Sequence, residues 1–213
     1  MIKPKSGGST QRELIPSGSH VARCYSMVHI GTVQWEYLGE VKHTDKVRIT
    51  WELPLETKEF KEGDVEKPFV ISNEYTLSMN EKANLRKDLE SWRGKGFTEK
   101  EADDFDITKL LGVKCMINVV HKEAKNGNTY SNVGGVSPIP KGMDCPAQIN
   151  ETFEFNFDDK FNLEWLATQP EFIKDMITST PEYRGRMDEM EHQEQVKKEV
   201  VVDAIQDNKE LPF

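Results

Sequence analysis

The chain has 213 residues, with 28 Lys and Arg against 37 Asp and Glu, and therefore a formal net charge of −9. Its mean hydropathy of −0.66 is that of a polar protein, and no apolar run approaches the roughly 20 residues that cross a bilayer. Because residues 1–8 also lack an apolar core, we expect neither a transmembrane span nor a secretory signal.

The charge is unevenly distributed along the chain. Residues 1–146 contain 21 basic and 21 acidic side chains, whereas residues 147–213 contain 7 and 16, so the last third carries the whole excess. This division predicts a neutral globular part and an acidic appendage with a separate role. We expect four units: a flexible leader over 1–18, a domain over 19–146, an extension packing on it over 147–180, and an acidic flexible tail over 181–213.

Five strands are predicted in the first two thirds of the chain. Small or apolar residues alternate with polar ones over 20–33 and 46–53, and further β-prone stretches over 69–79, 113–122 and 129–136 predict three more strands. The last two strands are joined by a tight turn at 125–128. Residues 34–39 are expected to form an aromatic loop and residues 55–67 a charged connection. On the first strand, one small or apolar face is predicted to contain Ala22, Cys24, Ser26, Val28 and Ile30.

A helical stretch separates the third predicted strand from the fourth. It starts at Asn80, carries Leu85, Leu89 and Trp92 at helical spacing, and is stopped by Gly94. Three strands, a helical insertion and a β-hairpin follow the order of the OB-fold, a five-stranded Greek-key barrel that binds oligonucleotides. We therefore predict a mainly β, OB-fold-like barrel with an acidic, partly helical C-terminal extension.

The pattern of apolar and charged residues changes after Pro146, where the predicted extension begins. Phe153, Phe155 and Phe157 alternate with polar residues and predict a short extra strand that covers a barrel edge. Residues 163–178 predict a helix, and from Pro181 onward the charge-rich sequence predicts weak order.

Single-strand binding by such a barrel requires cations that follow the phosphates and aromatic rings that stack on bases. Both kinds of residue occur together wherever an OB-fold presents its groove. The candidate DNA-binding residues are Arg23, Tyr25, His29, Trp35, Tyr37, Lys42, His43, Lys46, Arg48, Lys87, Trp92, Arg93, Lys95, His121, Lys122, Lys125 and Tyr130. Within this set we expect phosphate contacts from Arg23, Lys46, Arg48, Arg93 and Lys122, and base stacking on Trp35, Tyr37 and Trp92.

Core packing competes with DNA binding as the role of several aromatic residues. Trp51 alternates with Val47 and Ile49, which favours a place in the core. Trp92 follows the apolar stripe of the helix, so packing and stacking both remain open for it. Tyr130 is a common type of strand residue, and burial is equally consistent with its position.

No motif in the sequence indicates catalysis. A nucleophile elbow, a phosphate-binding glycine loop and a His-Glu-x-x-His pattern are all lacking, so we predict no enzyme, no cofactor and no metal. Asp103, Asp104 and Asp106 could hold Mg²⁺, but such a run is more often a solvated surface or a helix N-terminus. Cys24 and Cys115 fall on predicted strands and are expected to be buried, unreactive thiols, whereas the odd count with Cys145 favours a reducing cytoplasm.

The end of the sequence combines acidic side chains with an aromatic one. The ring and the α-carboxylate of Phe213, together with the preceding acidic side chains, suit a basic pocket on a partner protein. The acidic side chains could also compete with DNA for the groove. The predicted partner-binding residues are Asp203, Asp207, Glu210, Leu211, Pro212 and Phe213.

The chain resembles a family of bacteriophage single-stranded DNA-binding proteins. The similar stretches are His20–Val33, Val47–Pro54, Glu74–Lys95 and Leu110–Gly142, together with the acidic end in Pro-Phe, where Lys209 is a departure from the family pattern. The resemblance implies an OB-fold that coats single-stranded DNA during phage replication or recombination, in the host cytoplasm, and recruits replication proteins through its tail. Two other functions stay open: a protein-interaction adaptor without nucleic acid, and a metal-dependent DNA-processing enzyme.

Overall fold

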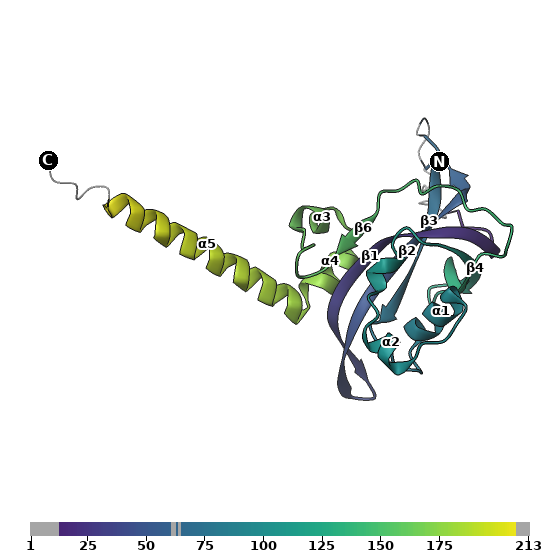
Figure 1. Cartoon of the computed structure of the whole chain (residues 1–213), viewed down its shortest axis with the longest axis horizontal. Helices are drawn as coiled ribbons and strands as arrows, with labels where there is room; N and C mark the ends of the chain where they lie inside the picture. Colours follow the sequence, from purple (N-terminus) through teal and green to yellow (C-terminus); the bar gives the residue numbers. More distant parts are fainter. Residues whose placement is uncertain (1–12, 61–62, 64, 208–213) are drawn as a thin grey trace, which may run out of the picture.

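The computed structural model describes residues 13–60, 63 and 65–207 of the chain. This part is mainly β: six strands form one sheet, the shorter helices lie beside it, and the long C-terminal helix projects away from it (Figure 1). The prediction of a mainly β protein is therefore confirmed. Within the described ranges, no helix combines the length and the apolar character that a membrane crossing requires.

The elements follow one another in the predicted order. The strands are β1 (Gly18–Tyr37), β2 (Glu40–Lys58), β3 (Lys67–Thr76), β4 (Lys114–Glu123), β5 (Thr129–Ser137) and β6 (Phe153–Phe155). Between β3 and β4 lie α1 (Asn84–Arg93), α2 (Glu99–Asp103) and the short 3₁₀ helix η1 (Ile107–Leu110). After β6 come α3 (Leu163–Thr168), α4 (Glu171–Thr178) and α5 (Pro181–Asp207).

The main strands form an antiparallel sheet in the order β3-β2-β1-β4-β5. Its two outer strands, β3 and β5, are not neighbours in this order, yet they contact each other, and α1 packs against both. The sheet is therefore strongly curved, with α1 lying across the place where its edges approach.

Strands β1 and β2 are longer than the sequence predicted. Residues 34–37 continue β1 instead of forming a loop, and a two-residue turn places Tyr37 opposite Glu40. Strand β2 continues past Pro54 to Lys58, where a connection was expected. An irregularity in its pairing with β3 between Leu53 and Thr57 accommodates the proline, which lacks an N–H group for the ladder.

The main hydrophobic core lies inside the curved sheet. Alternate residues of β2 point into it, and Trp51 among them is only 1% exposed, as predicted. Leu85 and Leu89 of α1 enter the same core, and Trp92 follows them. The rings of Trp51 and Trp92 lie 6.1 Å apart, so the helix is packed directly on the sheet.

A β-bulge changes the face that β1 presents to this core. Tyr25 is an additional residue between Cys24 and Ser26, whose partners on β2 are consecutive residues. The main core receives Ala22, Cys24 and Met27, and a second hydrophobic cluster receives Val28 and Ile30. The prediction of one continuous apolar face on this strand was therefore wrong, because a shift of one residue reverses the alternation beyond it.

The second hydrophobic cluster attaches the C-terminal extension to the outer side of β1. Strand β4 pairs with residues 18–23 of β1, and β6 pairs with residues 26–28 in parallel. Beside Val28 and Ile30, the buried members of this cluster are Phe155, Phe157, Leu166, Ile173 and Ile177. The helix predicted over 163–178 is divided into α3 and α4 at Gln169 and Pro170, because proline cannot continue the preceding helix.

Residues 181–207 form the helix α5 where we expected weak order (Figure 1). The buried Thr180 precedes it, and the Thr180 hydroxyl accepts a hydrogen bond from the N–H of Tyr183 at 3.3 Å. Proline at the first helical position, many helix-forming side chains and ion pairs such as Arg186–Glu189 and Lys198–Glu194 favour a helix without a large apolar face.

The end of the predicted leader is also part of the fold. Ile15 is buried in the main core, and its backbone N–H donates to the Ser131 hydroxyl at 3.0 Å. Its carbonyl oxygen lies 2.8 Å from Nε2 of His121. Ile15 therefore fixes the chain against β4 and β5 before β1 begins.

Gly31 allows α5 to begin directly against β1. Its φ of +91° is one that side chains rarely adopt, and an added Cβ would lie 2.9 Å from Glu182 Oε2, 3.0 Å from Phe157 and 3.1 Å from Thr180 Oγ1. The Glu182 carboxylate accepts hydrogen bonds from the backbone N–H and the hydroxyl of the next residue, Thr32, at 3.0 and 2.5 Å.

Substitution of Gly31 by alanine should destabilise the protein by about 2–4 kcal/mol, because backbone strain and steric overlap add. Gly185 is the matched control: nothing lies within 4 Å of its added Cβ, and in a helix Gly185→Ala should be neutral or stabilise by about 1 kcal/mol. Urea unfolding of both variants measures the difference. Equal stability of the two variants would contradict the role of Gly31.

Candidate nucleic-acid interface

The guanidinium of Arg23, a predicted phosphate ligand, is hydrogen-bonded to the protein backbone. Its guanidinium donates hydrogen bonds to the carbonyl oxygens of Gly112, Cys145 and Pro146 at 2.9, 3.3 and 2.7 Å. Its partner in the β1–β2 register, Glu52, is fully buried and accepts N–H groups from residues 149 and 150. Both side chains hold the segment 145–150 on the sheet, so Arg23 has a structural role, and its guanidinium is already engaged by three carbonyl oxygens.

Trp92 is likewise a structural residue. It is 6% exposed, and its Nε1 donates to the carbonyl oxygen of Lys114 at 3.0 Å. A ring in this position cannot stack on a base unless α1 leaves the sheet. The sequence left base stacking and core packing open for Trp92, and the structure shows core packing.

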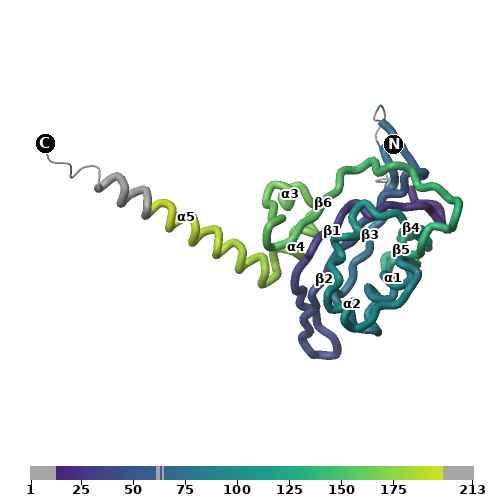
Figure 2. The backbone as a smooth tube through the Cα atoms, viewed as in Figure 1, coloured from purple at the N-terminus to yellow at the C-terminus, as the bar shows by residue number. Residues whose placement is uncertain are grey.

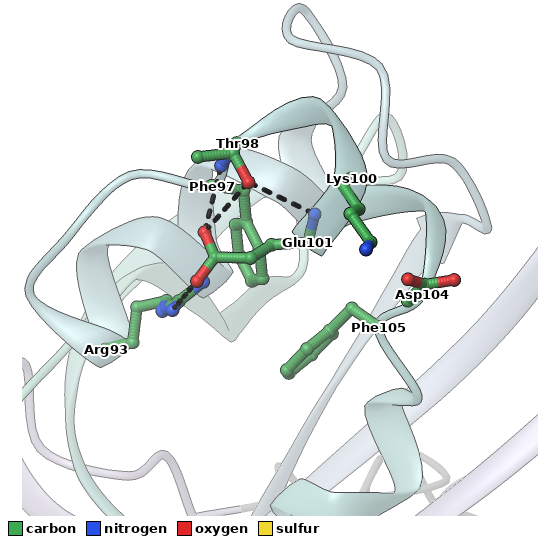
Figure 3. Close-up of a pocket in the computed structure, with 7 residues that line it drawn as sticks. All are labelled: Arg93, Phe97, Thr98, Lys100, Glu101, Asp104 and Phe105. Carbon is green, nitrogen blue, oxygen red and sulfur yellow. Dashed lines mark hydrogen bonds and ion pairs between the residues drawn. The ribbon is translucent and has the colours of Figure 1, made fainter.

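Arg93 lines a small hollow of about 320 Å³ beside α2, together with Glu101 (Figure 3). Lys95 is linked to the same Glu101. The Glu101 carboxylate lies 3.2 Å from Nη2 of Arg93 and 3.6 Å from Nζ of Lys95. The Arg93 guanidinium also lies 4.1 Å from the centre of the Phe97 ring. These two cations are therefore already paired.

Glu101 should make the stability of this network depend on pH. Hydrogen bonds from the backbone N–H of Thr98 and from Arg93 lower the pKa of Glu101 from 4.5 to about 2. A carboxyl group whose pKa falls on folding stabilises the protein above its unfolded pKa, and this contribution is lost as the pH falls toward the folded value. Glu101→Gln should therefore lower the melting temperature at pH 7, and the difference from wild type should shrink between pH 4.5 and pH 2.

Thermal melting across this pH range tests the expectation. Glu191→Gln is the control, because Glu191 is exposed on α5. A difference for Glu101→Gln that stays constant with pH would show that the charge of Glu101 does not act in this way.

Three further candidates lie on the outer side of β1 and β2, where the extension packs. His29 lies 2.8 Å from Asp45 and meets the edge of Phe157, and Arg48 pairs with Glu74 at 2.9 Å. The Arg48 guanidinium also lies 5.9 Å from the ring centre of Phe172, which is 54% exposed. Tyr25 is half-buried, and burial raises the pKa of its hydroxyl.

A groove of about 760 Å³ opens where β3 and β5 approach and α1 begins. Three lysines line it: Lys82 and Lys87 at the start of α1, and Lys122 from β4. The other lining side chains are mostly polar, and they include Asn73, Asn80, Asn84 and Asn132.

The two acidic side chains of this groove are already engaged. Glu74 is paired with Arg48, and Asp88 accepts a hydrogen bond from the Tyr75 hydroxyl at 2.7 Å. Burial and the adjacent Asp88 raise the pKa of Tyr75, which therefore remains a hydrogen-bond donor. By contrast, none of Lys82, Lys87 and Lys122 forms an ion pair with a residue in the described part of the chain.

The N-terminus of α1 adds a favourable dipole to the groove. Its first turn contains no acidic residue, and Ala83 at the N-cap offers no side-chain acceptor. The positive end of a helix attracts anions such as phosphate. The groove can therefore accept an anionic, hydrogen-bonding ligand.

The hairpin end of β1 and β2, residues 32–45, forms an arm that extends beyond the rest of the sheet (Figure 2). Trp35 and Tyr37 lie on it with their ring centres 6.0 Å apart and are 43% and 52% exposed. Lys42 Nζ lies 6.0 Å from the Trp35 ring centre and 5.0 Å from that of Tyr37. His43 is exposed on the same arm, opposite Gln34.

The groove and the arm adjoin each other. Lys46 lies opposite Thr76, which lines the groove, and the N–H of Leu77 donates to the carbonyl oxygen of Asp45 at the base of the arm. On the other side of the groove, Lys122 lies opposite the exposed Tyr130, and Lys125 follows in the turn. The structure therefore brings Lys87 and Lys122 into one groove and places Lys46 and Tyr130 opposite residues that line it. Lys125 lies in the turn beyond Lys122, and Nε2 of His121 lies 2.8 Å from the carbonyl oxygen of Ile15.

Sequence reasoning missed Lys82 and Phe172 as candidates. Lys82 lies in the turn before α1, five residues from Lys87, so no helical spacing associates the two. Phe172 reaches Arg48 from α4, more than 100 residues away in the chain. A count of lysines near the predicted helix start would have found the first, but only the folded structure reveals the second.

The acidic run considered for Mg²⁺ does not form a ligand set. Asp106 caps η1, where its Oδ1 accepts hydrogen bonds from the N–H and the hydroxyl of Thr108. In the described residues, no group of three or more His, Cys, Asp or Glu side chains has a geometry that could hold a metal ion.

The predicted partner-binding residues fall at the limit of the described structure. Asp203 and Asp207 lie in α5, and Glu210, Leu211, Pro212 and Phe213 lie outside the described residues.

Comparison of the chain with known protein families, with curated proteins and with solved structures found no significant match.

Proposed function

We propose that the protein is a non-catalytic, sequence-independent single-stranded DNA-binding protein that uses the groove and the arm. The observation that carries this proposal is the convergence of Lys82, Lys87 and Lys122, without ion-pair partners among the described residues, in a chain with a net charge of −9. Cations gathered in this way can follow a phosphate backbone.

Lysines and the α1 dipole supply the electrostatic part of binding. They neutralise phosphates and release counterions, so affinity should fall steeply with salt. None of these groups distinguishes one base from another, which agrees with binding that is independent of sequence.

The arm supplies the stacking part. The exposed faces of Trp35 and Tyr37 can receive bases that are free of a partner strand, and Lys42 beside them can meet a phosphate. Bases in a duplex are already stacked and paired, so this contact favours single strands.

We also propose that the curved sheet is an OB-fold-like barrel. The strand order β3-β2-β1-β4-β5, the contact between β3 and β5, and the helix between β3 and β4 support this assignment. The arm is then the loop between the first two strands, and residues 124–128 are the loop between the last two.

The resemblance to phage proteins supports a role in coating DNA during replication or recombination. In this proposal, the acidic residues 203–213 recruit replication proteins, and their charge suits basic partner surfaces. Pull-down of host and phage replication proteins with the full chain and with a chain lacking residues 208–213 tests this part separately from DNA binding.

Removal of the groove lysines should weaken DNA binding in a salt-dependent manner. For Lys87→Ala with Lys122→Ala, we expect lower affinity for oligo(dT) and a slope of log K against log salt that is less steep by about 0.7 for each phosphate that the variant no longer neutralises. Fluorescence anisotropy at several salt concentrations measures both quantities. Lys109→Ala is the control, because Lys109 is an exposed lysine of η1 outside the groove. Unchanged affinity and slope in the double variant would reject the groove as the DNA path.

Trp35 should report on DNA binding by fluorescence. It is the exposed member of the four tryptophans, whereas Trp51 and Trp92 are buried and Trp165 is half-buried against Phe153. We expect oligo(dT) to quench the fluorescence of the wild type, but to have little effect on Trp35→Phe, which should still bind.

A matching duplex is the control for this titration. Quenching that persists in Trp35→Phe would place the bases elsewhere. Absence of both quenching and a gel shift in the wild type would reject DNA binding and favour the protein-interaction adaptor.

A further inference from the structure

The tip of the arm carries an apolar side chain that the fold does not explain. The turn residues Leu38 and Gly39 have φ values of +52° and +79°, the signs that a type I′ hairpin turn requires. Asn and Gly are favoured at the first turn position, whereas a leucine at positive φ is strained. Leu38 is also 86% exposed, so burial does not compensate for that strain.

Backbone strain at an exposed position is most often retained at sites that act on a ligand. The surroundings of Leu38 indicate which ligand this is. Immediately behind it lie the Trp35 and Tyr37 rings, with Lys42 beside them, and the arm joins the lysine-lined groove at Lys46 and Thr76. A single strand of DNA that follows the groove toward the arm would therefore reach the aromatic rings first and Leu38 last.

The two aromatic rings share one face of the arm. Tyr37 lies opposite Glu40 and Trp35 opposite Lys42, and the Glu40 carboxylate is 4.0 Å from the Lys42 ammonium. Glu36 alternates with the two aromatic residues along β1, so it belongs to the other face of the arm. Glu40 and Lys42 share the aromatic face and compensate each other, so the rings on this face can receive bases without net repulsion.

We propose that Leu38 is a wedge that inserts between bases where a single strand meets a duplex. Inserted apolar side chains, leucine among them, partly unstack base steps in other DNA-binding proteins. Bases within a flexible single strand separate without help, so the wedge has its effect at the first stacked pair of a junction. This inference rests on the proposed single-strand binding and adds to it a ligand class, a forked nucleic acid.

The test uses the full-length protein and a fork made of an oligo(dT) arm and a duplex with 2-aminopurine at the first pair. Insertion should increase the 2-aminopurine fluorescence in the wild type. In Leu38→Asn the increase should be lost, because the cost of unstacking is no longer offset by an apolar contact. Affinity for plain oligo(dT) should be unchanged in this variant.

Leu38→Met is the matched control, because it keeps an apolar side chain at the same φ and should retain the increase. Asparagine suits a type I′ turn, so the melting temperature of Leu38→Asn should be equal to that of the wild type or higher, which excludes misfolding as the cause.

The outcomes separate this inference from the proposed function. If the wild type does not bind oligo(dT), the proposed function fails. If all three proteins bind oligo(dT) and Leu38→Asn opens the fork as well as the wild type, or Leu38→Met opens it no better than Leu38→Asn, the wedge is overturned and binding stands.

Discussion

Strand β1 belongs to two hydrophobic cores, and the rest of the structure depends on the β-bulge that makes this possible. The additional residue Tyr25 reverses the alternation of the strand, so Ala22, Cys24 and Met27 pack inside the curved sheet and Val28 and Ile30 pack against the extension. The sheet and the extension therefore share a strand rather than a flexible linker. The same strand fixes the start of α5 through Thr32 and Glu182, and then continues into the exposed arm.

The distribution of ion pairs separates structural cations from those that are free to bind a ligand. Arg23 holds backbone carbonyl groups, and Arg93 pairs with Glu101. The lysines of the groove face no such partner in the described part of the chain. Residues 1–146 carry no net charge, so lysines that gather in one groove without acidic partners make that place locally positive, which favours anionic ligands there.

The arm keeps apolar and aromatic side chains exposed, and the stability of the sheet makes this possible. A two-stranded hairpin is marginally stable alone, and here it is continuous with strands that are anchored in the sheet. The stability of the sheet therefore permits aromatic and apolar side chains to remain accessible at Trp35, Tyr37 and Leu38. In the proposed function a single strand of DNA buries these side chains, and the length of β1 and β2 is what presents them.

The sequence by itself determined the mainly β character, the order of the main elements and the inward position of Trp51, because period-two alternation and turn signals are local properties. Tertiary structure alone decided that Trp92 packs on the sheet, that Arg23 holds a segment more than 100 residues away, and that Lys82 joins Lys122 in one groove. It also decided where β1 changes face, since one inserted residue leaves no mark in the composition. The burial of Trp92, the hydrogen bonds of Arg23 and the meeting of the lysines depend on which segments distant in sequence come into contact. Local sequence patterns do not specify those contacts.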